Sequence, residues 1–176
     1  MQILLGCGHS RVKKLSVTDS AEWTDLVTVD MNEDVKPDIL WDLSRLPYPF
    51  EDSIADEIHA YDVLEHMGQQ GDWRFFFAQW TELWRILKPG GFFIGISPKW
   101  NGKWAWGDPG HTRVVQPEQF IYLHQPSYGQ VGSSPLTDYR FCWKGDFDIA
   151  VIEDTPGQPD CFSYVLQAVK PARLEV

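Results

Sequence analysis

The chain has 176 residues, of which 43% are hydrophobic and 23% are charged. A chain of this length and composition is expected to fold as one globular domain over residues 1–176, and no apolar run approaches the roughly 20 residues that span a bilayer. Lys and Arg number 15 against 25 Asp and Glu, so the formal net charge is −10. Because nucleic-acid binding draws on basic side chains that neutralise phosphates, we expect neither a nucleic-acid partner nor a membrane partner.

The cysteines point to a reducing compartment. Cys7, Cys142 and Cys161 are an odd number and form no C-x-x-C pair, which argues against a disulfide framework and against a cysteine zinc site. Only six residues precede Cys7, too few for the charged and apolar regions of an export signal. We therefore expect a cytoplasmic protein.

Short apolar runs predict a series of strands through the first hundred residues. Each run is bounded by glycine, proline or aspartate, and the predicted strands cover 3–5, 26–29, 38–41, 55–60 and 92–96. Between Asp30 and Asp38 the chain is too short, and too broken by Pro37, for a full crossover helix. A helix is predicted to start within 62–67, directly after the fourth strand.

The clearest helix follows Asp72, which is a plausible N-cap. Large apolar side chains then recur at three- and four-residue steps until the sequence Pro89-Gly90-Gly91 stops the pattern. We interpret these side chains as core rather than as cofactor contacts: Trp73, Phe76, Phe77, Trp80, Leu83, Trp84 and Leu87.

The last part of the chain is predicted to return to strands. An irregular segment, 98–146, contains one short predicted helix at 117–124. Strands at 147–152 and 162–169 are separated by a connector that is long enough for a hairpin and too short for a helix. The whole pattern predicts an α/β fold, Rossmann-like, with a mostly parallel seven-stranded sheet, a C-terminal antiparallel hairpin and reduced helices after strands one and two.

Glycines and acids fall where the first three predicted strands end. Parallel strands bring these ends to one edge of the sheet, where ligands bind in open α/β folds. Gly6 and Gly8 let the backbone approach a ligand closely, Asp30 can accept both hydroxyls of a ribose, and Asp42 with Leu43 can meet an adenine edge. The alternative is that the glycines only make a tight turn and the two aspartates cap connections.

In order and spacing, these residues resemble the class I S-adenosylmethionine-dependent methyltransferases, in particular a short variant of the methyltransferase type 11-like group. The segments 4–10, 29–30 and 42–43 look like that family's first motif, ribose acid and adenine site; 47–53 and 60–66 look like the surroundings of its fourth strand, and 87–91 like the loop before its fifth. The resemblance covers residues 1 to about 100 motif by motif. It implies S-adenosyl-L-methionine as the cofactor, with contacts from Gly6, Cys7, Gly8, Asp30, Met31, Asp42, Leu43, Tyr61 and Asp62.

Two competing enzyme classes fail on particular residues. A nicotinamide-binding G-x-G-x-x-G motif would place its third glycine at Arg11. Amino-methylating nucleic-acid enzymes carry an Asp/Asn-Pro-Pro-aromatic motif after strand four, where this chain has Tyr61-Asp62-Val63-Leu64. The Pro-Cys nucleophile of the cytosine-carbon enzymes is missing too, because none of the three cysteines follows a proline.

The reaction implied is methyl transfer to a small-molecule or carbohydrate-like acceptor. In-line displacement needs orientation and no covalent residue, and a general base would help deprotonate the acceptor. His66 and His111 are the candidates by position, although each can equally make one structural hydrogen bond. No metal site is expected, because Asp62 and Glu65 are too few acids to define one. The alternative function is an inert methyltransferase-like binding module or subunit, favoured by Leu4 where the family usually has an acid.

Substrate choice is assigned to the segment 98–146. Its most unusual part, Trp100 to Trp106, could line an aromatic acceptor site, or contact a protein partner or a second copy of the chain. The favoured interpretation is a hairpin turning at Asn101-Gly102 and packing its tryptophans on the sheet.

Overall fold

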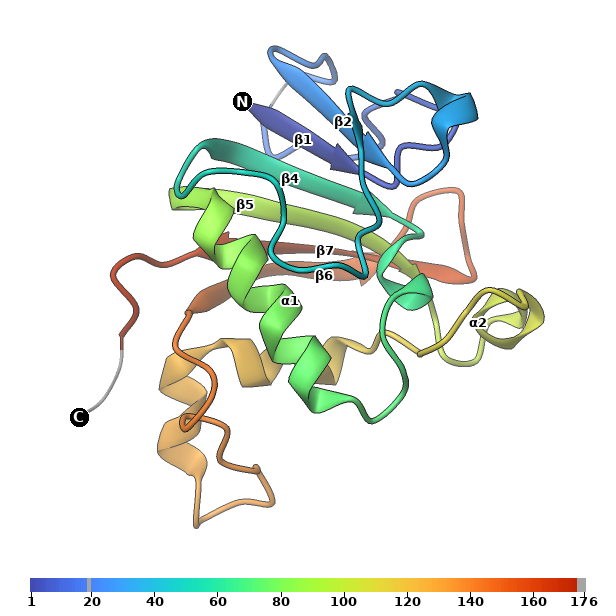
Figure 1. Cartoon of the computed structure of the whole chain (residues 1–176). Coiled ribbons are helices and arrows are strands. Elements are labelled where there is room, and N and C mark those ends of the chain that lie inside the picture. The colour runs from blue at the N-terminus through green and yellow to red at the C-terminus, as the bar shows by residue number, and fades with distance from the viewer. Residues whose placement is uncertain (19, 174–176) are drawn as a thin grey trace.

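A computed structural model describes residues 1–18 and 20–173, and its centre is one sheet (Figure 1). The strands lie in the order β3-β2-β1-β4-β5-β7-β6. The first five in this order are parallel to one another, and β7 is antiparallel to both β5 and β6. The predicted α/β fold with a C-terminal antiparallel hairpin is thus confirmed. The strands are β1 (Gln2–Leu5), β2 (Leu26–Asp30), β3 (Ile39–Leu40), β4 (Ala55–Tyr61), β5 (Leu87–Pro98), β6 (Phe147–Asp154) and β7 (Cys161–Ala168).

Helical structure is sparse. The main helix, α1 (Trp73–Ile86), begins where its cap predicts, since Asp72 Oδ1 accepts a hydrogen bond from Phe75 N at 3.0 Å. Between β2 and β3 the chain forms only the short 3-10 helix η1 (Glu33–Val35), which confirms that no crossover helix fits there. The helix predicted after β4 is another 3-10 turn, η2 (Leu64–His66).

The remaining helical segments lie in the second half of the chain. They are α2 (Lys103–Gly107) and two 3-10 helices, η3 (Pro117–Leu123) and η4 (Gln125–Gln130). The helix predicted at 117–124 is therefore present, in the tighter 3-10 form. Among the described residues, no helix combines the length and the apolar character needed to cross a membrane.

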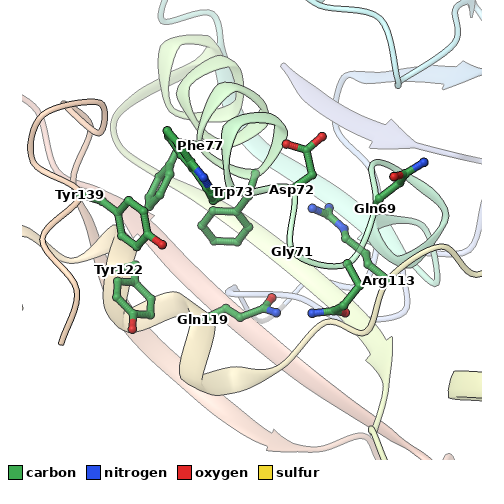
Figure 2. A pocket seen from close by; sticks show the side chains of 11 residues that line it. Gln69, Gly71, Asp72, Trp73, Phe77, Arg113, Gln119, Tyr122 and Tyr139 are labelled. Carbon is green, nitrogen blue, oxygen red and sulfur yellow. The ribbon is translucent and has the colours of Figure 1, made fainter. Parts of the chain in front are cut away.

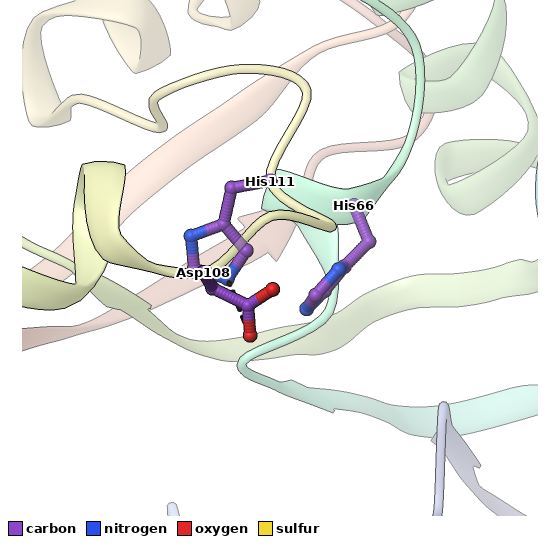
Figure 3. Close-up of side chains that lie close together, drawn as sticks. All are labelled: His66, Asp108 and His111. Carbon is purple, nitrogen blue, oxygen red and sulfur yellow. Dashed lines mark ion pairs between the residues drawn. The ribbon is translucent and has the colours of Figure 1, made fainter.

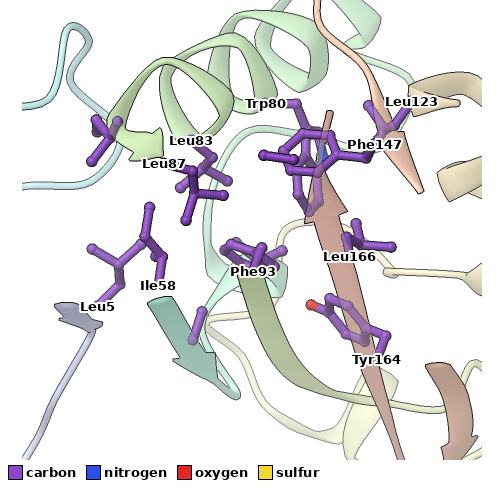
Figure 4. Close-up of a cluster of buried hydrophobic side chains, with 14 of the residues drawn as sticks. Leu5, Ile58, Trp80, Leu83, Leu87, Phe93, Leu123, Phe147, Tyr164 and Leu166 are labelled. Atoms are coloured by element: carbon purple, nitrogen blue, oxygen red, sulfur yellow. The ribbon is translucent and has the colours of Figure 1, made fainter. Parts of the chain in front are cut away.

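The larger apolar core lies between the sheet and α1 (Figure 4). Trp80 is 1% exposed, and its ring centroid lies 4.9 Å from that of Phe93 and 5.6 Å from that of Phe147. Strand alternation supplies the sheet side, with Ile58 and Ala60 of β4 in the same cluster. All of the apolar positions predicted along α1 lie in this core or pack against it, so their interpretation as core is confirmed.

No helix covers the opposite face of the sheet among the described residues. The segment 11–25, which connects β1 to β2, lies against it and supplies Leu15, Val17 and Trp23 to a second, smaller apolar cluster with Ile94 and Ile96. An irregular segment therefore stands where a reduced helix was predicted after strand one, and it covers this face of the sheet.

The hairpin predicted over Trp100–Trp106 is wrong. Both sides of β5 are already hydrogen-bonded, to β4 and to β7, so no free strand edge is left for a hairpin to extend. The chain turns instead, with Gly102 N donating to Lys99 O at 2.8 Å, and α2 starts there. Trp100, Trp104 and Trp106 are 58%, 54% and 72% exposed. Their roles in acceptor binding or partner contact stay predictions.

Candidate functional site

A cavity of about 240 Å³ opens at the edge of the sheet where β1, β2 and β4 end. Six of the nine residues predicted to bind the cofactor line it, together with His66. Sequence reasoning missed four further lining residues that the tertiary structure adds. The complete lining is Gly6, Asp30, Met31, Trp41, Asp42, Leu43, Ser44, Asp62, Val63, His66 and Met67.

The glycine turn after β1 is shaped by both of its glycines. Gly6 and Gly8 have φ values of +58° and +51°, a region that side chains disfavour. A Cβ on Gly6 would also lie 2.5 Å from Val63 Cγ2, so the turn packs against the start of the segment after β4. Gly8 and Cys7 do not line the cavity; the Cys7 thiol is buried, and burial raises its pKa.

Asp30 connects this turn to the end of β2. Its Oδ2 accepts from Gly8 N at 2.9 Å and its Oδ1 accepts from Asn32 N at 2.9 Å. A carboxylate has about four lone-pair sites, so these two bonds fix the side chain and leave capacity for two hydroxyl donors from a ligand. A ribose contact at Asp30 stays a prediction.

The end of β3 forms the neighbouring wall. Asp42 Oδ1 accepts from Ser44 N at 2.9 Å, and Leu43 is buried beside it. Trp41 lines the cavity with its indole tied down, because Nε1 donates to Arg45 O at 3.1 Å. A fixed flat ring beside a carboxylate suits a planar heterocycle with amino groups. The only sequence signal for Trp41 was its position directly before Asp42.

Tyr61 and Asp62 separate at the end of β4. The Tyr61 side chain lies on the face covered by segment 11–25, where its hydroxyl lies 2.6 Å from His59 Nδ1 and accepts from Leu15 N at 3.3 Å. Tyr61 therefore does not line the cavity. Asp62 does, in a left-handed backbone conformation of φ +58°, and its Oδ2 lies 3.3 Å from Lys14 Nζ. Successive side chains point to opposite faces of a strand, which separates these neighbours.

The two predicted catalytic histidines lie side by side (Figure 3). His66 lines the cavity, whereas His111 does not line it. The ring centroids of His66 and His111 are 4.5 Å apart, in an edge-to-face arrangement. Asp108 completes the group: its Oδ2 lies 3.9 Å from His111 Nε2, and its Oδ1 accepts from Gly110 N at 2.7 Å. The loop carrying Asp108 and His111 is held to η2 by Thr112 N, which donates to Glu65 O at 2.9 Å.

Two buried residues with ionisable side chains, Glu65 and Arg113, lie next to this loop. Burial raises the pKa of Glu65 to about 7, and its Oε2 accepts from Ser97 Oγ at 3.3 Å. The buried Arg113 donates from Nε to Leu64 O at 2.8 Å and from Nη2 to Gln79 Oε1 at 2.6 Å. The Arg113 bonds tie the loop after α2 to η2 and α1, and so fix the backbone on which His111 lies, while the Glu65 bond ties η2 to β5.

A second cavity, of about 230 Å³, lies at the start of α1 (Figure 2). It shares no lining residue with the first cavity. Aromatic rings and amide side chains dominate its wall, with Arg113 as the cationic group and Asp72 as the anionic one. The lining is Gln69, Gln70, Gly71, Asp72, Trp73, Phe76, Phe77, Arg113, Gln119, Tyr122 and Tyr139.

Comparisons with known proteins place this fold. No family model and no curated protein matches the chain by sequence. A S-adenosylmethionine-dependent methyltransferase from Aquifex aeolicus aligns with a TM-score of 0.55 and 14% identity, over 96% of this chain and 82% of that one. The fold is that of the class I S-adenosylmethionine-dependent methyltransferases.

Other structures with the methyltransferase fold agree. The N-methyltransferase NodS from Bradyrhizobium japonicum aligns with a TM-score of 0.58 and 14% identity, over 96% of this chain and 85% of that one. A phosphoethanolamine N-methyltransferase from Haemonchus contortus, solved with phosphoethanolamine and S-adenosylhomocysteine, gives a TM-score of 0.60 and 11% identity, over 99% of this chain and 40% of that one. At these identities the likeness establishes the methyltransferase fold, and the chemistry has to be argued from the cavity.

Proposed function

We propose that the protein transfers a methyl group from S-adenosyl-L-methionine to a small-molecule, carbohydrate-like acceptor. The observation that carries the proposal is the cavity at the carboxyl edge of the sheet. It joins Gly6, Asp30 and Asp42 from the ends of three strands, in a fold whose solved examples are methyltransferases. A ribose contact at Asp30 and an adenine contact at Asp42 account for both acids.

The chain's own residues would mainly orient the reactants. When bound, S-adenosyl-L-methionine supplies an electrophilic methyl group on a sulfonium centre. Asp30 would hold the ribose, while Trp41 and Leu43 would sandwich the adenine against the end of β3. Holding nucleophile, methyl carbon and sulfur in line can remove several kcal/mol from the barrier, on the order of 7 kcal/mol for well-oriented groups. No covalent intermediate is needed.

His66 is the proposed general base. It lines the cofactor cavity and is solvent-exposed, so it can take a proton from an acceptor and release it to water. His111 packs edge-on against its ring and orients it. A positioned base typically contributes about 10²- to 10⁴-fold, so His66→Ala is expected to lower kcat by that factor while leaving cofactor affinity within about twofold.

The acceptor is proposed to extend from His66 toward the second cavity. Met67 lines the first cavity and Gln69 the second, and two residues of chain span at most about 7 Å. The rings of Trp73 and Tyr139 can pack on the apolar face of a sugar, and the amide of Gln119 can hydrogen-bond its hydroxyls. The net charge of −10 disfavours a nucleic-acid acceptor.

Calorimetric titration with S-adenosyl-L-methionine and S-adenosylhomocysteine tests the cofactor proposal. We expect micromolar binding that falls at least tenfold in Asp30→Asn, since hydrogen bonds to a charged group contribute about 1.5–3 kcal/mol. Asn keeps an oxygen that can accept from Gly8 N, so the loop is disturbed less than in Asp30→Ala. Glu153→Ala, an exposed acid on β6 at the far edge of the sheet, is the matched control.

Each result of that titration has a definite meaning. Absence of binding to both compounds contradicts the proposed function. Binding that is unaffected by Asp30→Asn places the cofactor elsewhere. Binding followed by no turnover on a panel of sugars and small alcohols or amines would favour the alternative, an inert binding module.

A further inference from the structure

The structure assigns a metal site to the edge of the cofactor cavity. We infer that His66, Asp108 and His111 bind one divalent transition-metal ion of the Zn²⁺ type, open on one side to the cofactor cavity. Each residue offers one ligand atom, and these atoms all lie within 4.8 Å of one another. The sequence pattern gave no such site, because His66 follows β4 whereas Asp108 and His111 follow α2.

The spacing is close to what a metal needs. Zn²⁺ takes His nitrogens and carboxylate oxygens at about 2.0–2.2 Å, which in a tetrahedral site separates the ligand atoms by about 3.4 Å. The ligand atoms must therefore approach one another by up to about 1.4 Å. His66 is exposed and joined to the backbone by rotatable bonds, so its ring can supply that movement.

Gly110 organises the supporting contacts. Its amide donates to Asp108 Oδ1 at 2.7 Å, which leaves Oδ2 for a metal. Its carbonyl lies 3.2 Å from His66 Nδ1, so a proton on Nδ1 would leave Nε2 as the ligand. Metal-binding histidines usually donate their other N–H to a carbonyl or carboxylate in this way. A Cβ on Gly110 would lie 3.1 Å from both Asp108 Oδ1 and His66 Nδ1, so an alanine there would displace both side chains by a few tenths of an ångström.

The surroundings of His111 are a second, independent indication of a metal site. Its side chain is only 7% exposed, and its Nδ1 is buried with no hydrogen-bond partner in the described part of the chain. Its Nε2 points toward Asp108 Oδ2 at 3.9 Å, too long for a hydrogen bond. A metal at Nε2 would give that nitrogen the partner that Asp108 Oδ2, at 3.9 Å, does not provide, while Nδ1 keeps its buried position without one.

The ligand set selects the class of ion. Two imidazoles and one carboxylate are typical of Zn²⁺ and Fe²⁺ sites that keep open coordination positions, whereas Mg²⁺ and Ca²⁺ prefer all-oxygen sets. The open positions here would face the cavity, because His66 lines it. The metal could thus bind a water molecule or an acceptor oxygen in addition to its three protein ligands.

Its role in the reaction rests on the proposed function. A metal held by His66, Asp108 and His111 would lower the pKa of an acceptor hydroxyl bound to it, so that the hydroxyl could lose its proton to water. Its oxygen then forms a bond to the methyl carbon as the bond from that carbon to sulfur breaks, which leaves S-adenosylhomocysteine, a methyl ether and one released proton. Nothing is oxidised or reduced. The metal site therefore narrows the acceptor to one that is methylated on oxygen.

Metal binding can be measured without any cofactor. The purified chain is stripped with a chelator and titrated with ZnCl₂ by calorimetry, and separately with CoCl₂ by visible absorption, where a tetrahedral site gives intense d–d bands. We expect one ion per chain, with affinity reduced more than about 100-fold in His66→Ala and in His111→Ala, since loss of even an outer-shell partner costs 10–100-fold. Gly110→Ala is expected to weaken binding about tenfold.

The control is a histidine in a similar setting without a second histidine. His124 Nε2 lies 3.5 Å from Asp148 Oδ1, and His124→Ala is expected to bind both ions like the unmodified chain. His66→Ala is expected to fold, because His66 is exposed, so it remains informative if His111→Ala does not. Absence of a site, or a site that survives both His66→Ala and His111→Ala, overturns the inference.

The two proposals fail separately. Zinc binding without S-adenosyl-L-methionine binding would contradict the proposed function and keep the metal site. Cofactor binding and turnover that persist in chelator, with no zinc site by calorimetry, would overturn the metal site and leave His66 as a general base.

Discussion

The two faces of the sheet are closed by different kinds of interaction. On one face, α1 and the segment 117–147 pack large apolar rings against the strands, with Trp80, Trp143 and Phe147 fully buried. On the other face, the segment 11–25 covers a buried polar cluster as well as an apolar one. Lys13 Nζ lies 2.9 Å from Glu57 Oε2, and His59 Nε2 lies 2.8 Å from the same oxygen.

The difference teaches how a short chain covers a parallel sheet without a helix on each side. Glu57 and His59 lie on β4 in the middle of the sheet, and His59 pairs in register with Leu4 and Ile94. An irregular segment presents few apolar side chains, so specific ion pairs and hydrogen bonds hold it in place. Apolar packing tolerates variation, whereas a buried charge requires its partner.

The largest effect is expected from the apolar face. Trp80→Ala removes the ring that contacts Phe93, Phe120 and Phe147, and should lower the free energy of unfolding by roughly 3–5 kcal/mol. Urea denaturation followed by circular dichroism measures it. Trp104→Ala, which truncates an exposed ring, is the control and should stay within about 0.5 kcal/mol. A loss below 1 kcal/mol at Trp80 would mean that α1 is not part of the main core.

The next largest effect is expected from the ion pair on the other face. Lys13→Met leaves the Glu57 carboxylate buried without its cation and should cost about 3 kcal/mol. The double variant Lys13→Met with Glu57→Gln should recover at least half of that loss, because no uncompensated charge remains. The same denaturation experiment compares them. If the double variant is less stable than Lys13→Met alone, the pair is not coupled as described.

A pH-dependent effect is expected from His59. Burial lowers its pKa to about 4, against the opposing influence of Glu57, and the groups facing it are Glu57, Tyr61, Lys13 and Trp23. The unfolded chain binds a proton at His59 more readily than the folded chain does. Stability is therefore full above about pH 6.5 and falls as the pH drops toward 4, by up to about 1.4 kcal/mol per pH unit for one proton.

His59→Gln should remove that slope while keeping hydrogen-bonding groups for Glu57 and Tyr61. Burial alone would raise the pKa of Glu57, but its bonds from Lys13 and His59 outweigh burial and lower it, so acid titration of Glu57 adds a further loss at lower pH in both proteins. Denaturation curves from pH 7 to 4.5 separate the two contributions. Parallel curves for the two proteins would show that His59 does not titrate in this window.

The smallest effect is expected from Trp23→Phe. The replacement keeps an aromatic ring over Lys13 and His59 but removes the indole N–H that donates to Arg11 O. One hydrogen bond of this kind contributes about 1 kcal/mol, so the free energy of unfolding should fall by that amount. A loss equal to that of Lys13→Met would mean that the parts of the indole that Phe lacks hold the segment on the sheet as strongly as the ion pair does.

Much of the fold could be predicted because its signals are local. The apolar period and the cap at Asp72 specify α1, and short apolar runs ending in glycine or aspartate specify the first strands. Asp30 and Asp42 could be placed at one cavity because carboxyl ends of parallel strands share an edge. The hairpin predicted at Trp100–Trp106, with its tryptophans packed on the sheet, failed because turn chemistry at Gly102 does not reveal that both edges of β5 are occupied.

The residues of the candidate site also fall into a group that local sequence signals predict and a group that only the tertiary structure reveals. Gly6, Asp30, Asp42 and Leu43 could be predicted to line the cavity because they lie at strand ends. Trp41, Val63 and Met67 line it only as a result of tertiary packing. The alternation of polar and apolar residues over 57–61 is a local pattern, but only the path of segment 11–25 shows that its polar side is buried. The alternation of side chains along a strand is encoded locally, but the segment that covers each face of the sheet is not.

By itself, the amino-acid sequence determined most of the strands, the glycine turn, α1 and the final hairpin, because periodicity, caps and turns act over a few residues. Only the tertiary structure decided that His111 and Asp108 lie beside His66, that Tyr61 turns away from the cavity, and that Lys13 is buried against Glu57. These contacts join residues that are distant along the chain, and they depend on where whole segments cross the sheet.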